Sequence, residues 1–307
     1  MIWIVGAKGM LGREVSGELS REGIQTVETD IDLDFTDYPA VESFAVRHRP
    51  EWIVNCAAYT AVDRAESEPD KAFGLNVTGP KDLARAAEKT GAALIHISTD
   101  YVFGSAGGNA AEGVSGAALS EGDDTMPESV YGETKLAGEL AVAEETDRYV
   151  ILRTAWLYGQ YGNNFVSTML RLFRDKGAAK VVDDQWGCPT WAGDLAGAVR
   201  LVIETGSPLP EAEEAARYGT YHYCGSGRTS WYGFAGGISE IAFEYGMMNR
   251  LPQITPCTAD EYPTAAKRPA WSVLSTIKFE QTFHCKIPDW RESLRKYLRQ
   301  ISEKQGN

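Results

Sequence analysis

The chain begins with MIWIVGAKGMLG, Met1–Gly12, where a short apolar run leads directly into three glycines with GxxGxxG spacing. The apolar run predicts a buried strand, and the residues after the second glycine predict a helix. Glycine at this junction permits a sharp turn, lets a phosphate approach the backbone and lets the helix pack close to the sheet. Free backbone N–H groups at a helix N-terminus bind phosphate oxygens. The stretch therefore predicts a nucleotide-binding unit.

Strand-like and helix-like segments alternate through the first half of the chain. The expected strands after the first are Ile24–Glu28, Trp52–Asn55, Ala92–Ser98 and Tyr149–Arg153. The expected helices are Met10–Leu19, Val41–His48, Pro80–Thr90 and Tyr131–Glu145. Strands separated by helices imply a parallel sheet covered on both faces. The predicted fold class is therefore α/β, a Rossmann-type doubly wound parallel sheet with a smaller, mixed α/β C-terminal substrate-binding region.

The alternation loosens after about residue 155, which suggests a division of the chain. Residues 1–155 are expected to form a dinucleotide-binding domain, to which some later segments return, and residues 156–307 mainly a substrate-binding region. The later elements are expected to be helices at Phe165–Arg174, Asp194–Glu204, Ser230–Tyr245 and within Lys286–Asn307, and a strand at Tyr218–Cys224. Pro208–Arg217 is interpreted as a linker or short helix, and Leu251–Pro269, with four prolines, as mostly loop.

One segment of the first half, Gly104–Ser129, breaks the alternation with six glycines and an acidic run. It has neither helical nor strand periodicity, so it predicts a long, mobile loop. Loops of this length in a compact domain tend to be functional lids or disordered insertions.

The composition excludes several classes of partner. The 307 residues carry 30 Lys+Arg against 43 Asp+Glu, a formal net charge of -13, and an acidic surface repels a nucleic-acid backbone. No apolar run approaches the roughly 18 residues of a membrane span, and the apolar start is too short for a signal peptide. The five cysteines are odd in number and widely spaced, which is typical of reduced thiols. We therefore expect a cytoplasmic protein without nucleic-acid or membrane partners.

An acid about 20 residues after such a glycine loop bonds the adenosine ribose hydroxyls of a dinucleotide. Asp30 lies 18 residues after the last glycine of the loop, and Asp32 and Asp34 are close rivals. A carboxylate there favours NADH, because it repels a 2′-phosphate. Lys8 and Arg13 lie close enough in the sequence to offset that repulsion, so both NADH and NADPH remain open.

Tyr131 and Lys135 form a YxxxK pair at the start of a predicted helix, where the i,i+4 spacing places both side chains on one face. The pKa of free tyrosine is about 10, and a nearby ammonium is expected to lower it. Such a tyrosine can give a proton to a carbonyl oxygen. Thr99, within Ser98–Asp100 at the carboxyl end of a predicted strand, can share that oxygen. The small residues of Asn55–Ala58 let a cofactor approach the third strand.

These motifs together resemble the extended short-chain dehydrogenase/reductase superfamily. Further blocks follow in the order of the dTDP-4-dehydrorhamnose reductase family, and the resemblance extends from Met1 to about Trp290. The blocks are AAYTAVDRAE (Ala57–Glu66), STDYVF (Ser98–Phe103), YGETKLAGE (Tyr131–Glu139), RTAWLYG with GNNF (Arg153–Phe165), DDQWGCPT (Asp183–Thr190) and AKRP (Ala266–Pro269).

The resemblance implies that NADPH or NADH reduces the 4-keto group of dTDP-6-deoxy-L-lyxo-4-hexulose, or dTDP-4-dehydrorhamnose, to give dTDP-L-rhamnose. It implies that Tyr131 donates the proton, Lys135 tunes Tyr131 and binds ribose, and Thr99 polarises the substrate oxygen. The implied cofactor-binding residues are Gly6, Lys8, Gly9, Met10, Leu11, Gly12, Asp30, Asp34, Phe35, Ala57, Ala58, Tyr59, Asn76, Tyr131 and Lys135. The implied substrate-binding residues are Thr60, Val62, Thr99, Asp100, Trp156, Asn163, Asn164, Gln185 and Arg268. A guanidinium such as that of Arg268 suits a diphosphate.

The chain departs from the family pattern in three places. The loop before Tyr131 is unusually long and rich in glycine, and Met10 stands where the family often has a polar residue. Some relatives dimerise around a divalent metal held by carboxylates. Glu14 fits one ligand position, but no acids match the C-terminal ones. We therefore expect no metal, and both a monomer and a homodimer remain open.

Two alternative functions share these motifs. Another sugar-nucleotide reductase, epimerase or dehydratase would use the same scaffold, and a dehydratase would need an added acid beside the catalytic threonine, where Asp100 lies. A non-catalytic regulatory subunit resembling that of methionine adenosyltransferase would use the nucleotide fold as an interaction module. Retention of Thr99, Tyr131 and Lys135 argues for an enzyme.

Overall fold

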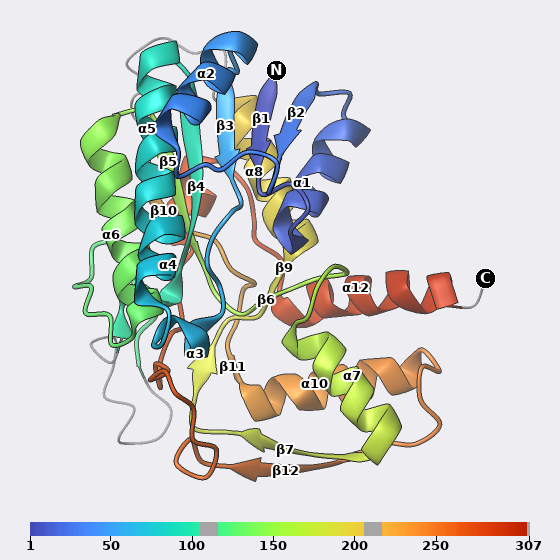
Figure 1. Cartoon of the computed structure of the whole chain (residues 1–307). Helices are drawn as coiled ribbons and strands as arrows, with labels where there is room; N and C mark the ends of the chain where they lie inside the picture. Colours follow the sequence, from blue (N-terminus) through green and yellow to red (C-terminus); the bar gives the residue numbers. More distant parts are fainter. Residues whose placement is uncertain (105–115, 206–216, 306–307) are drawn as a thin grey trace.

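The central feature of the computed structural model, which describes residues 1–104, 116–205 and 217–305, is a six-stranded sheet (Figure 1). Every strand pairing in it is parallel, and the strand order is β10-β5-β4-β3-β1-β2. The strands are β1 (Ile2–Val5), β2 (Thr26–Thr29), β3 (Trp52–Asn55), β4 (Ala93–Thr99), β5 (Tyr149–Thr154) and β10 (Gly219–His222). The order reverses between β1 and β3, which is the switch point of a doubly wound sheet. The predicted fold class is confirmed.

Helices cover both faces of this sheet, because alternate strand residues point to opposite sides. The helices of one face are α2 (Tyr38–His48), α5 (Gly79–Thr90) and α6 (Val130–Glu145), and those of the other are α1 (Met10–Arg21) and α8 (Ala192–Thr205) (Figure 1). Trp3 and Ile53 pack under the first layer, whereas Ile4 and Val54 pack under the second. All four side chains are 0% exposed. Strands that are buried on both faces are apolar at successive positions, and this continuous apolar pattern predicts them from the sequence.

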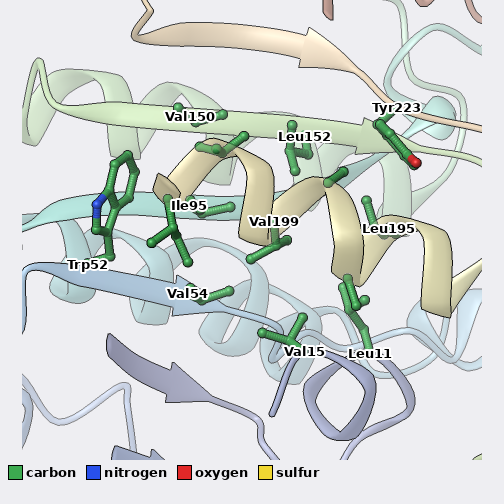
Figure 2. Close-up of a cluster of buried hydrophobic side chains, with 14 of the residues drawn as sticks. Leu11, Val15, Trp52, Val54, Ile95, Val150, Leu152, Leu195, Val199 and Tyr223 are labelled. Carbon is green, nitrogen blue, oxygen red and sulfur yellow. The ribbon is translucent and has the colours of Figure 1, made fainter. Parts of the chain in front are cut away.

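Segments that follow residue 155 return to this sheet. In helix α8, Leu195 and Val199 lie in the same buried cluster as Val54 and Ile95 (Figure 2). Strand β10 extends the sheet beside β5, and α11 (Ile277–Thr282) packs against β10 through Phe279. The division of the chain into two domains at residue 155 stays a prediction.

The remaining elements lie beyond the carboxyl ends of the sheet strands (Figure 1). The helices there are α7 (Phe165–Lys176), α10 (Trp231–Glu244) and α12 (Trp290–Gln305). The strand pairs there are β6 (Leu157–Tyr158) with β9 (Thr190–Trp191), β7 (Ala178–Val182) with β12 (Gln253–Cys257), and β8 (Trp186–Gly187) with β11 (Thr229–Ser230). Phe234 and Leu294, both 0% exposed, lie in the core that joins these helices. This part is the smaller, mixed α/β region that the sequence predicts.

Short elements between β3 and α5, and after β4, were not expected from the sequence. They are α3 (Val62–Ala65), α4 (Pro69–Phe73), a π-helical turn η1 (Gly74–Thr78) and a 3-10 turn η2 (Asp100–Val102). Leu251–Pro269 is mostly loop, as predicted, apart from the five residues of β12. Pro256 is tolerated there because β12 belongs to a two-stranded pair, in which one edge of the strand needs no N–H donor.

The predicted loop Gly104–Ser129 lies partly outside the described residues, as does nearly all of the predicted linker Pro208–Arg217. In the described part of the loop, Leu119 is 4% exposed and its N–H donates to the carbonyl of Val273 at 2.8 Å. Leu119 also forms an isolated β-bridge with Leu274. The described part of this segment is a loop, as predicted, and Leu119 is anchored within it because its apolar side chain is packed into a buried cluster.

All five cysteines are free thiols, with Cys188, Cys224 and Cys257 buried and Cys56 and Cys285 partly exposed. Within the described ranges, no helix has both the length and the apolar character needed to cross a membrane.

The core position of α8 yields a stability prediction. Leu195→Ala removes a side chain that is 0% exposed, and leucine truncation in a packed core costs about 2–5 kcal/mol. The same change at Leu140, which is 59% exposed on α6, is expected to cost less than about 0.5 kcal/mol. Urea unfolding of the two variants measures both values. Equal losses at the two positions would contradict the assignment of α8 to the core.

Candidate active site

The GxxGxxG loop joins β1 to α1 and lies against the end of β3. Gly6 has a φ of +76°, and a Cβ on it would lie 2.7 Å from the backbone nitrogen of Ala57. A Cβ on Gly12 would lie 2.7 Å from the Cα of Ala7. Gly9 is the N-cap of α1 and supplies no side-chain cap, so a bound anion can reach the N–H groups of the first turn. The loop has the geometry that pyrophosphate binding requires, at the switch point of the sheet.

The carboxylate of Asp30 is fixed beside this loop. It accepts hydrogen bonds from the backbone N–H groups of Lys8, at 2.9 Å, and Ile31, at 3.0 Å. The rival carboxylate of Asp34 instead accepts from the hydroxyl of Thr36 at 2.7 Å and from its N–H at 2.9 Å, and these bonds lower the pKa of Asp34. Both carboxylates therefore accept two hydrogen bonds within the chain, and Asp30 is the one that is bonded to the glycine loop.

Three of the predicted cofactor residues pack beneath or beside the loop. Phe35 and Leu11 are core side chains, 7% and 5% exposed, and the ring of Phe35 packs against Gly79 at the start of α5. Met10 is partly buried, and its side chain lies beside Gly159 after β6. Leu11 and Met10 thus anchor the start of α1 in the interior, whereas Phe35 packs against α5.

The end of β3 is tied to the helix that carries the predicted catalytic pair. Ala57 and Ala58 are small and partly exposed there. Asn76, which is 0% exposed in the π-helical turn, accepts the N–H of Tyr59 at 2.8 Å and donates to its carbonyl at 3.3 Å. The same amide donates to the hydroxyl of Thr134 on α6 at 3.1 Å. Asn76 thus fixes the distance between the β3 loop and α6.

The hydroxyl groups of Thr99, at the carboxyl end of β4, and of Tyr131, on α6, lie close to each other. Thr99 also donates to a carboxylate oxygen of Asp100 at 3.0 Å and accepts the N–H of Tyr101 at 3.3 Å. The ring of Tyr101 packs edge-on against Tyr131 with centroids 5.4 Å apart. These contacts hold both hydroxyls at one point of the sheet edge, where a carbonyl oxygen can interact with both.

The predicted effect of Lys135 on Tyr131 is wrong in this structure. Burial raises the pKa of Tyr131 to about 12, against a smaller lowering by the neighbouring side chain of Thr99. The ammonium of Lys135 donates to the carbonyl of Ile97 at 2.6 Å and lies 3.4 Å from Nε2 of His96, so its contacts are on β4. Burial also lowers the pKa of Lys135 itself to about 8. The phenol is therefore fully protonated at neutral pH, as a proton donor must be.

A buried ion pair lies one turn further along α6. The guanidinium of Arg153 donates to the carboxylate of Glu139, from Nη2 to Oε2 at 2.7 Å and from Nε to Oε1 at 3.0 Å. Both residues are under 7% exposed. Ser98 donates to the same carboxylate, and Phe103 lies 5.0 Å from the guanidinium. Sequence reasoning missed this pair. The available signal was a glutamate four residues after Lys135 and an arginine at the end of a predicted strand.

Arg268 and two other predicted substrate residues gather near α3. The guanidinium of Arg268 forms a bidentate pair with Asp63, at 2.8 and 3.1 Å, and this pairing lowers the pKa of Asp63. The N–H of Ala266 donates to Asp63 at 3.1 Å, so the loop of Arg268 is fastened to α3. Thr60 is exposed and Val62 partly exposed at the start of that helix.

Trp156 has a left-handed backbone, with φ of +48°, directly before β6. Its indole stacks on Trp231 with centroids 3.5 Å apart and planes at 5°. A Cβ on Gly187 would lie 2.5 Å from Cε2 of Trp156, so the glycine makes room for the ring. A bulky residue in this backbone region is strained, and such strain is concentrated at functional sites.

The other predicted substrate residues have different surroundings. Asn164 caps α7, because its side chain accepts the N–H of Ser167 at 3.0 Å and donates to the carbonyl of Gly159 at 2.8 Å. Asn163 beside it is exposed, and Gln185, before β8, is 8% exposed. The capping role accounts for Asn164 without a ligand, whereas Asn163 is accessible to one.

Glu14, the residue that fits a metal position of some relatives, lies on α1, and partial burial raises its pKa. In the part of the chain that the structure describes, no three or more His, Cys, Asp or Glu side chains gather as a metal site.

A parallel doubly wound sheet with a glycine loop at its switch point, and a Thr–Tyr–Lys set at the end of β4, defines the class of short-chain dehydrogenases and reductases. Residues 1–303 match the family described as the RmlD substrate binding domain. The dTDP-4-dehydrorhamnose reductases of Aggregatibacter actinomycetemcomitans and Escherichia coli K12 are each 38% identical to this chain. These alignments cover 95% and 98% of this chain and 96% and 97% of the relatives.

Solved structures agree with this likeness. The dTDP-4-dehydrorhamnose reductase of Clostridium acetobutylicum is 42% identical, with a TM-score of 0.86 over 98% of this chain and 99% of that one. The Bacillus anthracis enzyme, in complex with NADP, is 36% identical, with a TM-score of 0.86 over 97% and 98%. A Thermus thermophilus UDP-glucose 4-epimerase, at 19% identity and a TM-score of 0.77, shares the fold. The chain belongs to the dTDP-4-dehydrorhamnose reductase family, a family of oxidoreductases.

The buried carboxyl of Asp100 yields a prediction on pH dependence. Burial raises its pKa from the ordinary value of 3.8 to about 6, so the folded state binds this proton more tightly than the unfolded state. The contribution of Asp100 to stability is therefore largest below pH 4 and decreases as the pH rises to about 6. The Asp100→Asn variant has no carboxyl group at this position, so it lacks this loss of stability with rising pH. Relative to the wild type, its unfolding free energy is expected to rise by up to about 3 kcal/mol between pH 4 and 7.

Urea unfolding of both proteins at several pH values measures this difference. A difference between variant and wild type that does not change with pH would contradict the raised pKa.

Proposed function

We propose that this chain reduces the 4-keto group of dTDP-4-dehydrorhamnose with NADPH or NADH, giving dTDP-L-rhamnose. The observation that carries the proposal is the meeting of the Thr99 and Tyr131 hydroxyls at the carboxyl end of β4, with Lys135 one turn away on α6. The names of the relatives, which match over nearly their whole length, supply the substrate.

The residues at the switch point fit a dinucleotide. Side chains at Gly6 and Gly12 would collide with neighbouring backbone, so the loop leaves the N-terminus of α1 open to a pyrophosphate. The carboxylate of Asp30 suits the ribose hydroxyls, and the ammonium of Lys135 suits the ribose nearer the nicotinamide. When bound, the dinucleotide supplies the hydride.

Side chains of this protein donate the proton and orient the substrate oxygen that receives it. Tyr131 holds its proton at neutral pH, and the developing alkoxide of the substrate is a far stronger base than a ketone oxygen. The phenol therefore gives up its proton as negative charge develops on that oxygen. Thr99 orients the oxygen through the hydroxyl that also contacts Tyr131, and the edge contact of Tyr101 fixes the phenol ring.

The substrate is proposed to lie between the end of β4 and the smaller region. Arg268 carries the positive charge for the diphosphate, held by Asp63, and Trp156 offers an indole edge near the sugar. The proposed substrate residues are Thr60, Val62, Thr99, Asp100, Trp156, Asn163, Asn164, Gln185 and Arg268. Residues 156–307 are proposed to serve mainly this binding, except for the segments that return to the sheet.

The wider setting follows from the charge and the family. The net charge of -13 supports a protein without nucleic-acid partners, and we propose a cytoplasmic enzyme that works as a monomer or homodimer without a metal or a membrane partner.

Replacement of the proton donor tests the mechanism. Tyr131→Phe removes one hydroxyl and is expected to lower turnover at least about a hundredfold, with cofactor affinity unchanged, because the general acid is lost. Tyr149→Phe, at the amino end of β5, is the matched control and is expected to keep wild-type turnover. Turnover with the 4-keto sugar nucleotide and fluorescence titration with NADPH measure the two effects. Unchanged turnover in Tyr131→Phe would refute the assignment.

A second test concerns cofactor choice. Asp30→Asn removes a negative charge beside the glycine loop, so the ratio of kcat/KM for NADPH to that for NADH is expected to rise about tenfold. Asp34→Asn is the matched control, since the Asp34 carboxylate is occupied by Thr36 and is expected to leave the ratio nearly unchanged. Equal changes in both variants would show that Asp30 has no particular place at the ribose.

A further inference from the structure

His96 on β4 lies directly beneath the catalytic lysine. It is 0% exposed, with its Nδ1 3.0 Å from the amide nitrogen of Asn55 and its Nε2 3.4 Å from the ammonium nitrogen of Lys135. Neither histidine nor asparagine has a role in the mechanism described above. The two contacts nevertheless fix which ring nitrogen carries hydrogen.

The orientation of the Asn55 amide determines which ring nitrogen of His96 carries hydrogen. The N–H of Ala57 donates to Oδ1 of Asn55 at 3.0 Å, so the oxygen of that amide is on the side of the backbone. The NH₂ group therefore faces His96, and because it can only donate, Nδ1 of His96 must accept. Burial and the charge of Lys135 hold the pKa of His96 well below its usual range, so the ring is neutral. A neutral ring that accepts at Nδ1 carries its hydrogen on Nε2.

That hydrogen points at Lys135. A charged ammonium has three N–H groups and no lone pair, so an Nε2–H faces another donor, whereas a neutral amine can accept it. We infer that His96, held by Asn55 as the Nε2–H tautomer, is a positioning residue that disfavours the charged form of Lys135 and sets the upper pH limit of catalysis. This inference rests on the proposed function of Lys135.

The other groups around Lys135 act in known directions. On its own helix, Glu139 raises the pKa of Lys135, but its carboxylate is shared with Arg153 of β5. Tyr131 lies one turn before it, and the carbonyl of Ile97 on β4 accepts one of its hydrogens. Burial and His96 therefore act together against Glu139, and this balance keeps the pKa of Lys135 near the working pH.

The test is the pH profile of kcat/KM for the 4-keto sugar nucleotide. His96→Gln can turn a carboxamide oxygen to Lys135, and Asn55→Asp forces hydrogen onto Nδ1 and leaves a lone pair on Nε2. Both variants are expected to move the alkaline limb upward by about one pH unit, a tenfold change in proton affinity. His222→Gln changes another buried histidine, on β10, and is the matched control whose limb stays in place.

A second measurement needs no variant to fold. In wild-type protein labelled with ¹⁵N-histidine, the His96 ring is expected to show hydrogen on Nε2 and none on Nδ1 from pH 6 to 9. Hydrogen on Nδ1, or titration in this range, would overturn the inference, as would unmoved alkaline limbs in both variants. The spectrum does not depend on turnover, so a chain without reductase activity would refute the proposed function separately.

Discussion

Helix α1 can start at the end of β1 only because Gly12 carries no side chain. A Cβ there would collide with the backbone of Gly6 and Ala7 at the turn, and a Cβ on Gly6 would collide with Ala57 at the end of β3. This close approach brings the N-terminus of α1, the end of β3 and the catalytic end of β4 to one edge of the sheet. The site depends on that edge, because a parallel sheet places all strand carboxyl ends together.

A second constraint is the charge buried behind the site. Lys135, Glu139 and Arg153 are each under 7% exposed. Glu139 and Arg153 pair with each other, and Lys135 donates to a backbone carbonyl. The ammonium is therefore held against β4, one turn of α6 from Tyr131. We propose that the positive charge for the phosphates comes instead from the α1 N-terminus and from Arg268, within a chain that is acidic overall.

The sequence predicted the sheet well because its strands are continuous apolar runs. Thr99 and Tyr131 are candidates from the sequence because their motifs are local, and their roles stay predictions. The sequence did not predict features that depend on contacts between residues far apart in the chain. The bridge of Leu119 needs a partner far along the chain, the role of Asn76 depends on α6, and the burial that raises the pKa of Tyr131 is a tertiary effect. The prolines of Leu251–Pro269 favour a loop, so the sequence did not predict strand β12, which pairs with β7 through its backbone.

The central claim is that this chain moves a hydride to a keto carbon and a proton to its oxygen. The most direct measurement incubates the purified protein with dTDP-4-dehydrorhamnose and NADPH or NADH deuterated at nicotinamide C4, and examines the sugar by NMR. The account predicts dTDP-L-rhamnose with deuterium at C4 and stoichiometric oxidation of the cofactor. Unchanged sugar and cofactor, with both shown to bind, would contradict it.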